Sequence, residues 1–303
     1  MSYLNRTLPY VNAYGTVDIS STTSIKDALD LASMNWEVVS KSLFDENGNA
    51  YPNYKANVRD DTNDLLGIVT DRYRIVQNED AFEFVDGLSD EGFKFESAGT
   101  FRNGRSIWLM GHFEDETILG DDIANNLVFV NSHDGSSGVK VMMTPVRVIC
   151  SNMLNLALRK AHRSWATKHT TGIYSKLEEA KHTLGLADKY MAELKEEAEK
   201  LSNITITDAK IEEIFDKMFP VDPTKDSERK VKNVSAIKDS YVQCYNEDDI
   251  KKFKGTVYGA VNAMADLVSH KEPARVTKNG NENNWNRLIN GHSMLDEFYR
   301  LAR

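Results

Sequence analysis

The spacing of apolar residues divides the chain into a first half that predicts strands and a second half that predicts helices. Short alternating or continuous apolar runs predict strands at Trp36–Val39, Leu65–Val69, Phe93–Glu96, Ser106–Met110, Leu127–Asn131 and Val139–Met142. The last four pair as two antiparallel hairpins, because their connections are too short for crossovers. The first hairpin is expected to turn at Asn103-Gly104 with type I′ geometry, and Pro145 is expected to break the last strand.

Apolar residues recurring with a period near 3.6 predict the helices, and capping residues set their ends. Helices are expected at Ile25–Ser33, at Asn78–Leu88, from Ser151 or Asn152 to Trp165, from the cap Thr207 to Phe219, at Ala236–Tyr245, at Asp249–His270 and from Trp285 onward, with Lys225–Lys232 as a charged loop. The fold class is therefore α+β, an antiparallel β-meander with packed helices followed by an all-helical C-terminal half. The expected divisions are an irregular arm over 1–30, a sheet with helices over 31–172, and a helical region over 173–303.

Residues 173–201 show a heptad pattern. Its apolar positions are Leu177, Ala180, Leu184, Ala187, Met191, Leu194, Ala198 and Leu201. A pattern of this length suits a long helical arm or an oligomer seam, and it suits an ordinary bundle helix equally well.

Charge is segregated sharply along the chain. The stretch Gly135–Leu177 has no Asp or Glu in 43 residues and seven Lys or Arg, whereas the whole chain has a net charge of −9. Within it, the predicted helix over 152–165 has an apolar half and a basic half, and Arg159 and Arg163 repel each other unless an anion lies between them. Phosphates would satisfy this face, with Asn152 and Asn155 as neutral donors and Trp165 or Tyr174 as a stacking ring. The candidate nucleic-acid-binding residues are Lys140, Arg147, Asn152, Asn155, Arg159, Lys160, Arg163, Trp165, Lys168 and His169. The alternative is that carboxylates of the chain itself neutralise this face.

Sequence motifs for other chemistry are absent. The chain has no phosphate-binding glycine loop, no H-E-x-x-H and no G-x-S-x-G. The loop Asn131–Ser137 could serve a hydrolase or nuclease through His133 and Asp134, but a tight hairpin explains it better. Cys150 and Cys244 are expected to be small buried hydrophobic residues, and His162, His169 and His182 lack neighbouring metal ligands, so no metal and no cofactor is expected. No apolar run is long enough for a membrane helix and no signal peptide is recognisable, so we expect no membrane association and a cytoplasmic protein.

Several short blocks together resemble the phage/plasmid-like protein family, also catalogued as domain of unknown function nine-three-two. The blocks are Leu66-Gly67-Ile68-Val69, Arg72-Tyr73, Val76–Glu79, Asn131–Ser137, Thr144–Cys150 with Asn152, Asn155–Leu158, His169-Thr170, Gly255–Ala263 with His270, Trp285 and Gly291. Met153 departs from the family pattern, in which a Thr follows the Asn. The resemblance implies a mobile-element origin and supplies no activity. The order of helix, β-meander and basic helix is also similar to that of single-strand annealing proteins, which is a fold-level analogy only.

These observations favour a non-enzymatic, phage- or plasmid-encoded protein that binds single-stranded nucleic acid, expected to be DNA, in annealing, recombination or replication. We expect a homo-oligomer. The alternative is a non-catalytic oligomeric interaction protein, a scaffold or an antagonist of host defence, whose basic face docks an acidic partner.

Overall fold

The computed structural model describes residues 16–22, 24–86, 92–147, 152–153, 164–184, 187–222, 224–271 and 280–303. Its centre is an antiparallel eight-stranded sheet in the order β1-β5-β6-β8-β9-β10, with β7 paired to β8 and β11 paired to β9. The strands are β1 (Val17–Asp18), β5 (Lys94–Phe101), β6 (Ser106–His112), β7 (Glu116–Ile118), β8 (Asp121–Ser132), β9 (Val139–Arg147), β10 (Asn152–Met153) and β11 (Ser164–Thr167). The predicted α+β class is confirmed, with strands in the N-terminal half and helices mostly in the C-terminal half.

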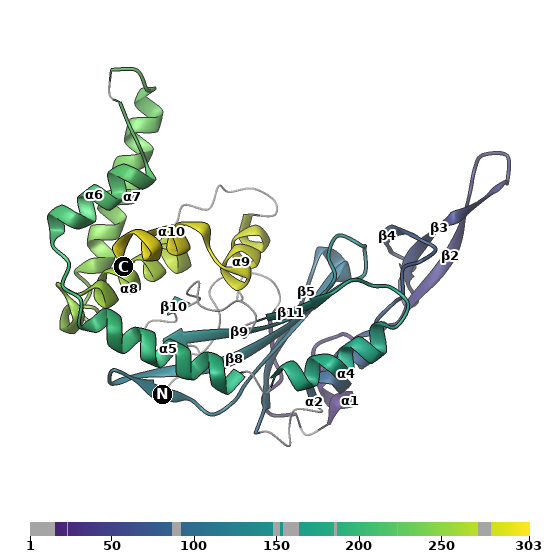
Figure 1. The fold of residues 1–303 in the computed structure, drawn as a ribbon. Helices are drawn as coiled ribbons and strands as arrows, with labels where there is room; N and C mark the ends of the chain where they lie inside the picture. Colours follow the sequence, from purple (N-terminus) through teal and green to yellow (C-terminus); the bar gives the residue numbers. More distant parts are fainter. Residues whose placement is uncertain are drawn as a thin grey trace.

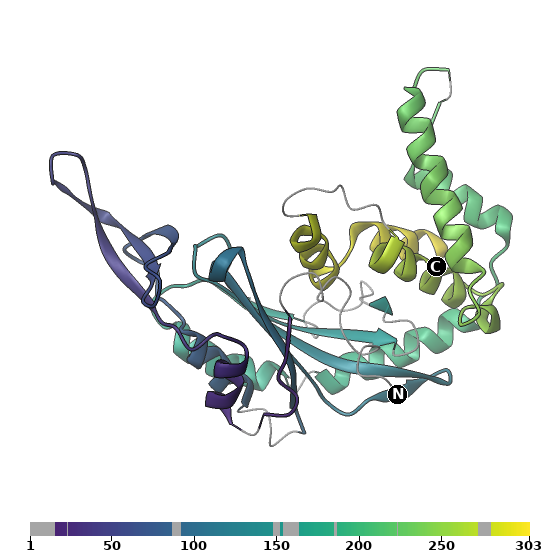
Figure 2. The ribbon, with the colours of Figure 1, turned by 180° about the vertical axis from the view of Figure 1, so that it is seen from behind.

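Helices cover both faces of this sheet. On one face, Phe84 of α2 (Asn78–Asp86) packs 5.4 Å from Phe129 of β8, measured between ring centroids. On the other face, Trp285 of α9 (Gly280–Asn290) lies 5.7 Å from Trp108 of β6. Figures 1 and 2 show the sheet between these two layers. The remaining body helices are α1 (Ile25–Leu31), α4 (Ile173–Leu184), α5 (Ala187–Ser202), α8 (Val257–Asp266) and α10 (Ser293–Ala302).

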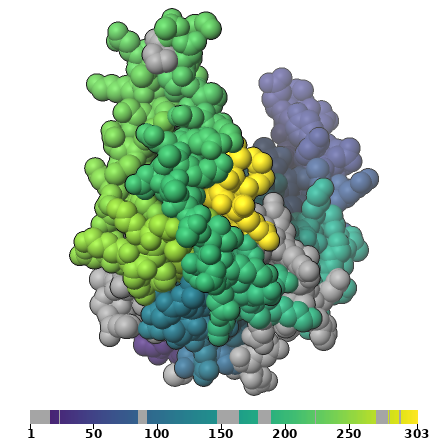
Figure 3. Space-filling view, turned by 60° about the vertical axis from the view of Figure 1, so that its left-hand side comes forward, coloured from purple at the N-terminus to yellow at the C-terminus, as the bar shows by residue number. Residues whose placement is uncertain are grey.

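Two projections stand on the same side of the body, at its opposite ends (Figures 1 and 3). One is a three-stranded sheet of β2 (Val38–Phe44), β3 (Ala50–Arg59) and β4 (Leu65–Thr70), which we call the β arm. The other is formed by α6 (Asp208–Met218) and α7 (Glu228–Tyr245), whose N-caps are Thr207 and Ser227. The predicted Thr207 cap is thus confirmed, whereas α7 begins inside the segment expected to be a charged loop.

The two predicted hairpins are confirmed by the pairing of β5 with β6 and of β8 with β9. The first turn is longer than expected, because Arg102, Asn103 and Gly104 form a short 3-10 turn with positive φ angles of 51°, 58° and 90°. An Asn and a Gly tolerate this conformation at low cost, so the sequence signal marked the right place with the wrong turn type.

The expected break at Pro145 is wrong, because β9 continues through it to Arg147. Pro145 lies opposite Asn125, and the carbonyl of Asn125 accepts a hydrogen bond from Phe113, on the side away from β9. This is therefore a non-hydrogen-bonded pair, in which residue 145 would direct an N–H away from β8. On that side β11 pairs only with residues 139–142 and β10 only with 146–147. Proline is tolerated here because no described strand lies opposite its nitrogen to accept the missing hydrogen bond.

The predicted helix from 151 or 152 to 165 is wrong at both ends. Asn152 and Met153 form β10 against Arg147 and Val146, and Ser164–Thr167 form β11 against Met142–Val139. Residues 154–163 lie outside the described residues. The open edge of β9 offers unpaired backbone groups, and pairing with them outweighs the helical spacing of the side chains at both ends.

The heptad pattern corresponds to α4 and α5, and residues 185–186 between them are not described. Leu177, Met191, Leu194, Ala198 and Leu201 are buried in the hydrophobic core of this single chain. The pattern therefore fits body-packed helices, and these five positions leave no apolar seam for a partner.

Candidate nucleic-acid interface

The end of β8 and the turn that follows it, residues 131–138 and here called the loop 131–138, join the β arm to the main sheet. Asn57 of β3 donates a hydrogen bond of 2.8 Å to the carbonyl of His133, and the backbone of Gly67 in β4 lies directly against Asp134. The Tyr73 hydroxyl donates to the carbonyl of Ser132, and the Asn131 amide donates to the carbonyl of Val76. Two sequence blocks separated by more than fifty residues thus meet at one junction and satisfy each other's buried polar groups.

His133 is fully buried in this junction. Its Nε2 lies 3.0 Å from Oδ1 of Asn78, whose amide nitrogen donates to the carbonyls of Met34 and Trp36. Because the Asn78 oxygen can only accept, Nε2 carries the proton and Nδ1 holds a buried lone pair. Burial, with His169 nearby, lowers the pKa of His133 to about 3, although Asp134 opposes the shift. A neutral, enclosed imidazole positions the loop, so a hydrolase or nuclease built on His133 has no structural support.

His169 follows β11 and is also buried. Its ring stacks on Tyr73 with centroids 4.4 Å apart, and its Nδ1 donates to the carbonyl of Arg74 at 2.8 Å. Burial lowers the pKa of His169, while the hydrogen bond to Arg74 raises it less. The backbones of Arg74 and His169 are hydrogen-bonded as well, so this contact fixes the end of β11 to the segment after β4.

Four cationic residues lie at or near this contact between the end of β11 and the segment after β4. Lys140 lies on β9 opposite Ala166 of β11, and Lys168 comes two residues after Ala166. The backbone N–H of Arg74 donates to the carbonyl of His169, the residue after Lys168. The Nζ of Lys55 donates to the carbonyl of Tyr73. The pKa of Lys55 is lowered mainly by burial and next by the positive charge of Arg74, whereas the negative charge of Asp71 raises it. We call Lys55, Arg74, Lys140 and Lys168 the basic seam.

The basic seam is not neutralised by the part of the chain that the structure describes. None of its four residues lies within 4.0 Å of a described carboxylate, and Lys168 and Arg74 are exposed. Lysines outside the seam are of both kinds, and Lys26, Lys41, Lys94, Lys176, Lys189, Lys195, Lys232 and Lys254 also have no such partner among the described residues. Lysines with a carboxylate partner within that distance are Lys200, Lys210, Lys217, Lys225, Lys230, Lys238, Lys251 and Lys252. What distinguishes the seam is that the fold brings together cations from three segments distant in sequence in a chain with a net charge of −9, which leaves a surface that can bind an external anion.

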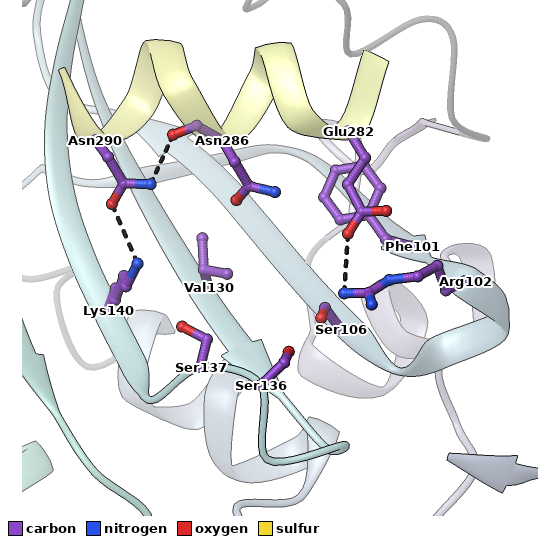
Figure 4. A pocket seen from close by; sticks show the side chains of 10 residues that line it. All are labelled: Phe101, Arg102, Ser106, Val130, Ser136, Ser137, Lys140, Glu282, Asn286 and Asn290. Atoms are coloured by element: carbon purple, nitrogen blue, oxygen red, sulfur yellow. Dashed lines mark hydrogen bonds and ion pairs between the residues drawn. The ribbon is translucent and has the colours of Figure 1, made fainter. Parts of the chain in front are cut away.

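A polar pocket of about 270 Å³ opens beside Lys140, between the main sheet and α9 (Figure 4). From the sheet side it is lined by Phe101, Arg102, Ser106, Val130, Ser136, Ser137 and Lys140. From α9 it is lined by Glu282, Asn286 and Asn290, which are spaced four residues apart and therefore share one face of the helix. Arg102 forms an ion pair of 3.0 Å with Glu282, and Lys140 donates to Oδ1 of Asn290 at 3.2 Å.

Among the described residues, one group could be considered for a metal ion. Ligand atoms of Cys244, Glu247 and Asp266 lie within 4.8 Å of one another, near the contact of α7 with α8 and not in the pocket. A thiol and two carboxylates with no further indication of an ion do not establish a metal site. Cys244 is buried as expected, and Cys150 lies outside the described residues.

The chain matches the family described as Domain of unknown function (DUF932) over residues 65–289, about three quarters of its length. It belongs to that family. The resemblance inferred from the short sequence blocks is thereby confirmed, and the matched residues include the basic seam except Lys55 and the pocket lining except Asn290. No curated protein and no solved structure matches the chain. None of the described helices has the length and apolar character that crossing a membrane requires.

The predicted site residues fall into four groups. Lys140 and Lys168 lie on the basic seam, and Trp165 is half-buried on β11. His169 is buried under Tyr73, so its side chain belongs to the junction and not to a binding surface. Arg147 and Asn152 are described only as paired backbone of β9 and β10. Asn155, Arg159, Lys160 and Arg163 lie outside the described residues.

Sequence reasoning missed Lys55, Arg74, Arg102 and the asparagines of α9. Lys55 and Arg74 come from segments distant in sequence, so no local pattern could place them beside Lys168. The α9 residues did leave a signal, since Glu282, Asn286 and Asn290 recur at helical spacing opposite Trp285 and Leu288. The helix was predicted only from Trp285 onward, so Glu282 was left outside it and the stripe was not recognised.

Proposed function

We propose that this member of the family is a single-stranded nucleic-acid-binding protein of a phage or plasmid, acting in DNA annealing, recombination or replication in the cytoplasm of its host cell. The observation that carries the proposal is the basic seam, whose cations have no carboxylate partner among the described residues of a chain with a net charge of −9. Phosphates of an extended strand supply the missing negative charge, and release of their counterions favours binding. The adjoining basic positions Arg159, Lys160 and Arg163 extend the same charge along the sequence.

Charge reversal on the seam tests this proposal. In the double variant Lys140→Glu with Lys168→Glu, affinity for a short labelled single-stranded DNA is expected to fall by about 100-fold at low salt, because two attractive interactions with phosphate become repulsive. The slope of log affinity against log salt should also become shallower by about 0.7 for each phosphate that the variant no longer neutralises. Fluorescence anisotropy over a salt series measures both quantities.

The matched control reverses two lysines that already have carboxylate partners. Lys200 and Lys230 are exposed and lie 2.6 Å from Glu196 and 2.9 Å from Asp226, respectively. The double variant Lys200→Glu with Lys230→Glu has the same net charge as the test variant and should keep the parent's salt slope. Equal reductions of affinity in the two double variants would show a general charge effect and contradict a specific seam. Failure of the parent to bind single-stranded DNA even at low salt would contradict the function itself.

A second candidate is a non-catalytic oligomeric interaction protein, and the β arm favours it. On its outer face Tyr54, Leu65 and Ile68 are about half exposed, and Phe44 and Tyr51 are exposed further along the arm. Exposed apolar surface of this kind is what interfaces between protein subunits bury. Light scattering after size exclusion separates the candidates. An assembly that changes size when DNA is added supports nucleic-acid binding, and a fixed oligomer indifferent to DNA supports the interaction protein.

A further inference from the structure

The interior of the α9 pocket is close to neutral. The guanidinium of Arg102 lies 3.0 Å from Glu282 and 3.6 Å from Asp134, so the charge of this cation is offset within the pocket wall. Lys140 is the lining cation without a carboxylate partner among the described residues, and it belongs to the basic seam as well. A ligand that suits this arrangement is uncharged where it enters the pocket and anionic where it passes Lys140.

The polar groups facing the pocket divide into fixed and available ones (Figure 4). Arg102 holds Glu282 and Lys140 holds Asn290, at the two ends of the α9 stripe. Between them, the side-chain amide of Asn286 has no hydrogen-bond partner among the described residues, and neither do the hydroxyls of Ser106 and Ser136 across the pocket. An amide offers a donor and an acceptor side by side, which is the pattern that pairs with the edge of a nucleobase.

The remaining lining is apolar. Phe101 contributes an aromatic ring and Val130 a branched aliphatic side chain. Pockets for small ligands combine such walls with a few placed polar groups. A volume of about 270 Å³ is sufficient for one flat heterocycle and excludes a folded peptide or a duplex. The size of the pocket, its near neutrality and the amide of Asn286 therefore all favour a flat, uncharged heterocycle such as a nucleobase.

We propose that the pocket receives the base of one nucleotide, read by the Asn286 amide, while the phosphate of that nucleotide lies at Lys140. This inference rests on the proposed function, because the nucleotide is taken to be an unstacked nucleotide of the bound single strand. Single-stranded chains present bases in this way, because their edges are not occupied by a complementary strand. A free mononucleotide has the same chemistry and is the alternative source.

The test compares two labelled oligomers of equal length, one a mixed-sequence single-stranded DNA and the other an abasic strand with the same phosphates. The parent is expected to bind the DNA about tenfold more tightly than the abasic strand, a difference of one well-made set of polar contacts. Asn286→Ala should reduce that preference to about twofold or less and leave affinity for the abasic strand unchanged. Ser136→Ala should weaken the preference in the same direction from the opposite wall.

The matched control is Asn283→Ala, which removes the same amide from an exposed position of the same helix. It should keep the parent's preference, and thermal unfolding should be unchanged in all three variants. Equal affinity of the parent for the two strands overturns the base pocket but leaves phosphate binding intact. Absence of binding to either strand overturns the proposed function itself. A mononucleotide that binds with Asn286-dependent affinity equal to or above that of the DNA overturns the strand as source and assigns the pocket to a free nucleotide.

Discussion

Gly67→Ala is expected to lower the free energy of unfolding by about 3 kcal/mol, because the added methyl group has no room. A Cβ at this position would lie 2.6 Å from Cα of Asp134 and 2.8 Å from its carbonyl oxygen. The obstructing atoms include backbone, so relief requires the arm and the loop 131–138 to separate, which breaks the hydrogen bond from Asn57 to His133. Urea unfolding followed by circular dichroism measures the decrease in stability.

The neighbouring Ile68→Ala provides the control for this substitution. Ile68 is 57% exposed on the outer face of the β arm, so truncating it should change stability by no more than about 0.5 kcal/mol. Near-parental stability of Gly67→Ala would mean that the arm is not held against the loop in solution.

Stability is expected to fall steeply as the pH drops below about 6.5, because two histidines are buried in neutral form. The folded-state pKa of His133 is about 3, and that of His169 is also below its ordinary value. Since both lie below the unfolded-state value, the unfolded chain takes up protons first. The stability is therefore complete above about pH 6.5 and decreases as the pH falls. Each histidine contributes a slope of up to about 1.4 kcal/mol per pH unit.

Urea unfolding at several pH values between about 8 and about 5 measures this slope, and the range above about 7 serves as the internal reference, where both imidazoles are neutral in either state. His133→Gln should remove the larger part of the slope whatever its effect on absolute stability. A parent stability that stays flat down to about pH 5 would mean that neither ring is held in its neutral form by the folded protein.

Local patterns predicted much of this fold. The hairpins, α2 and the cap at Thr207 follow from alternation, period and capping chemistry that operate within a dozen residues. The two ends of the predicted basic helix were wrong because β10 and β11 form by pairing with the free edge of β9. A short stretch of sequence does not show that this edge is available. The strand break predicted at Pro145 was wrong for a related reason. A proline destabilises a strand only where a neighbouring strand would accept a hydrogen bond from its nitrogen.

The candidate site was predictable in part. Charge segregation identified Lys140 and Lys168, because the absence of acids is visible in sequence. Burial of His169 was not visible, since the stacking partner Tyr73 lies almost a hundred residues earlier. The pocket depends on the meeting of β9 with α9, so its asparagines could be recognised as one face of a helix but not as the wall of a site.

The loop 131–138 contacts both the β arm and the α9 pocket, and this shared contact has one further consequence. One side of it is held by Asn57 and Gly67 of the β arm, and Ser136 and Ser137 on its other side face the pocket. Any occupant of the pocket that favours this loop conformation must also favour attachment of the arm. Thermodynamic linkage makes the effect reciprocal, so that a ligand of the arm that changes this attachment also changes affinity at the pocket, by the factor through which the occupant of the pocket changes affinity for that ligand.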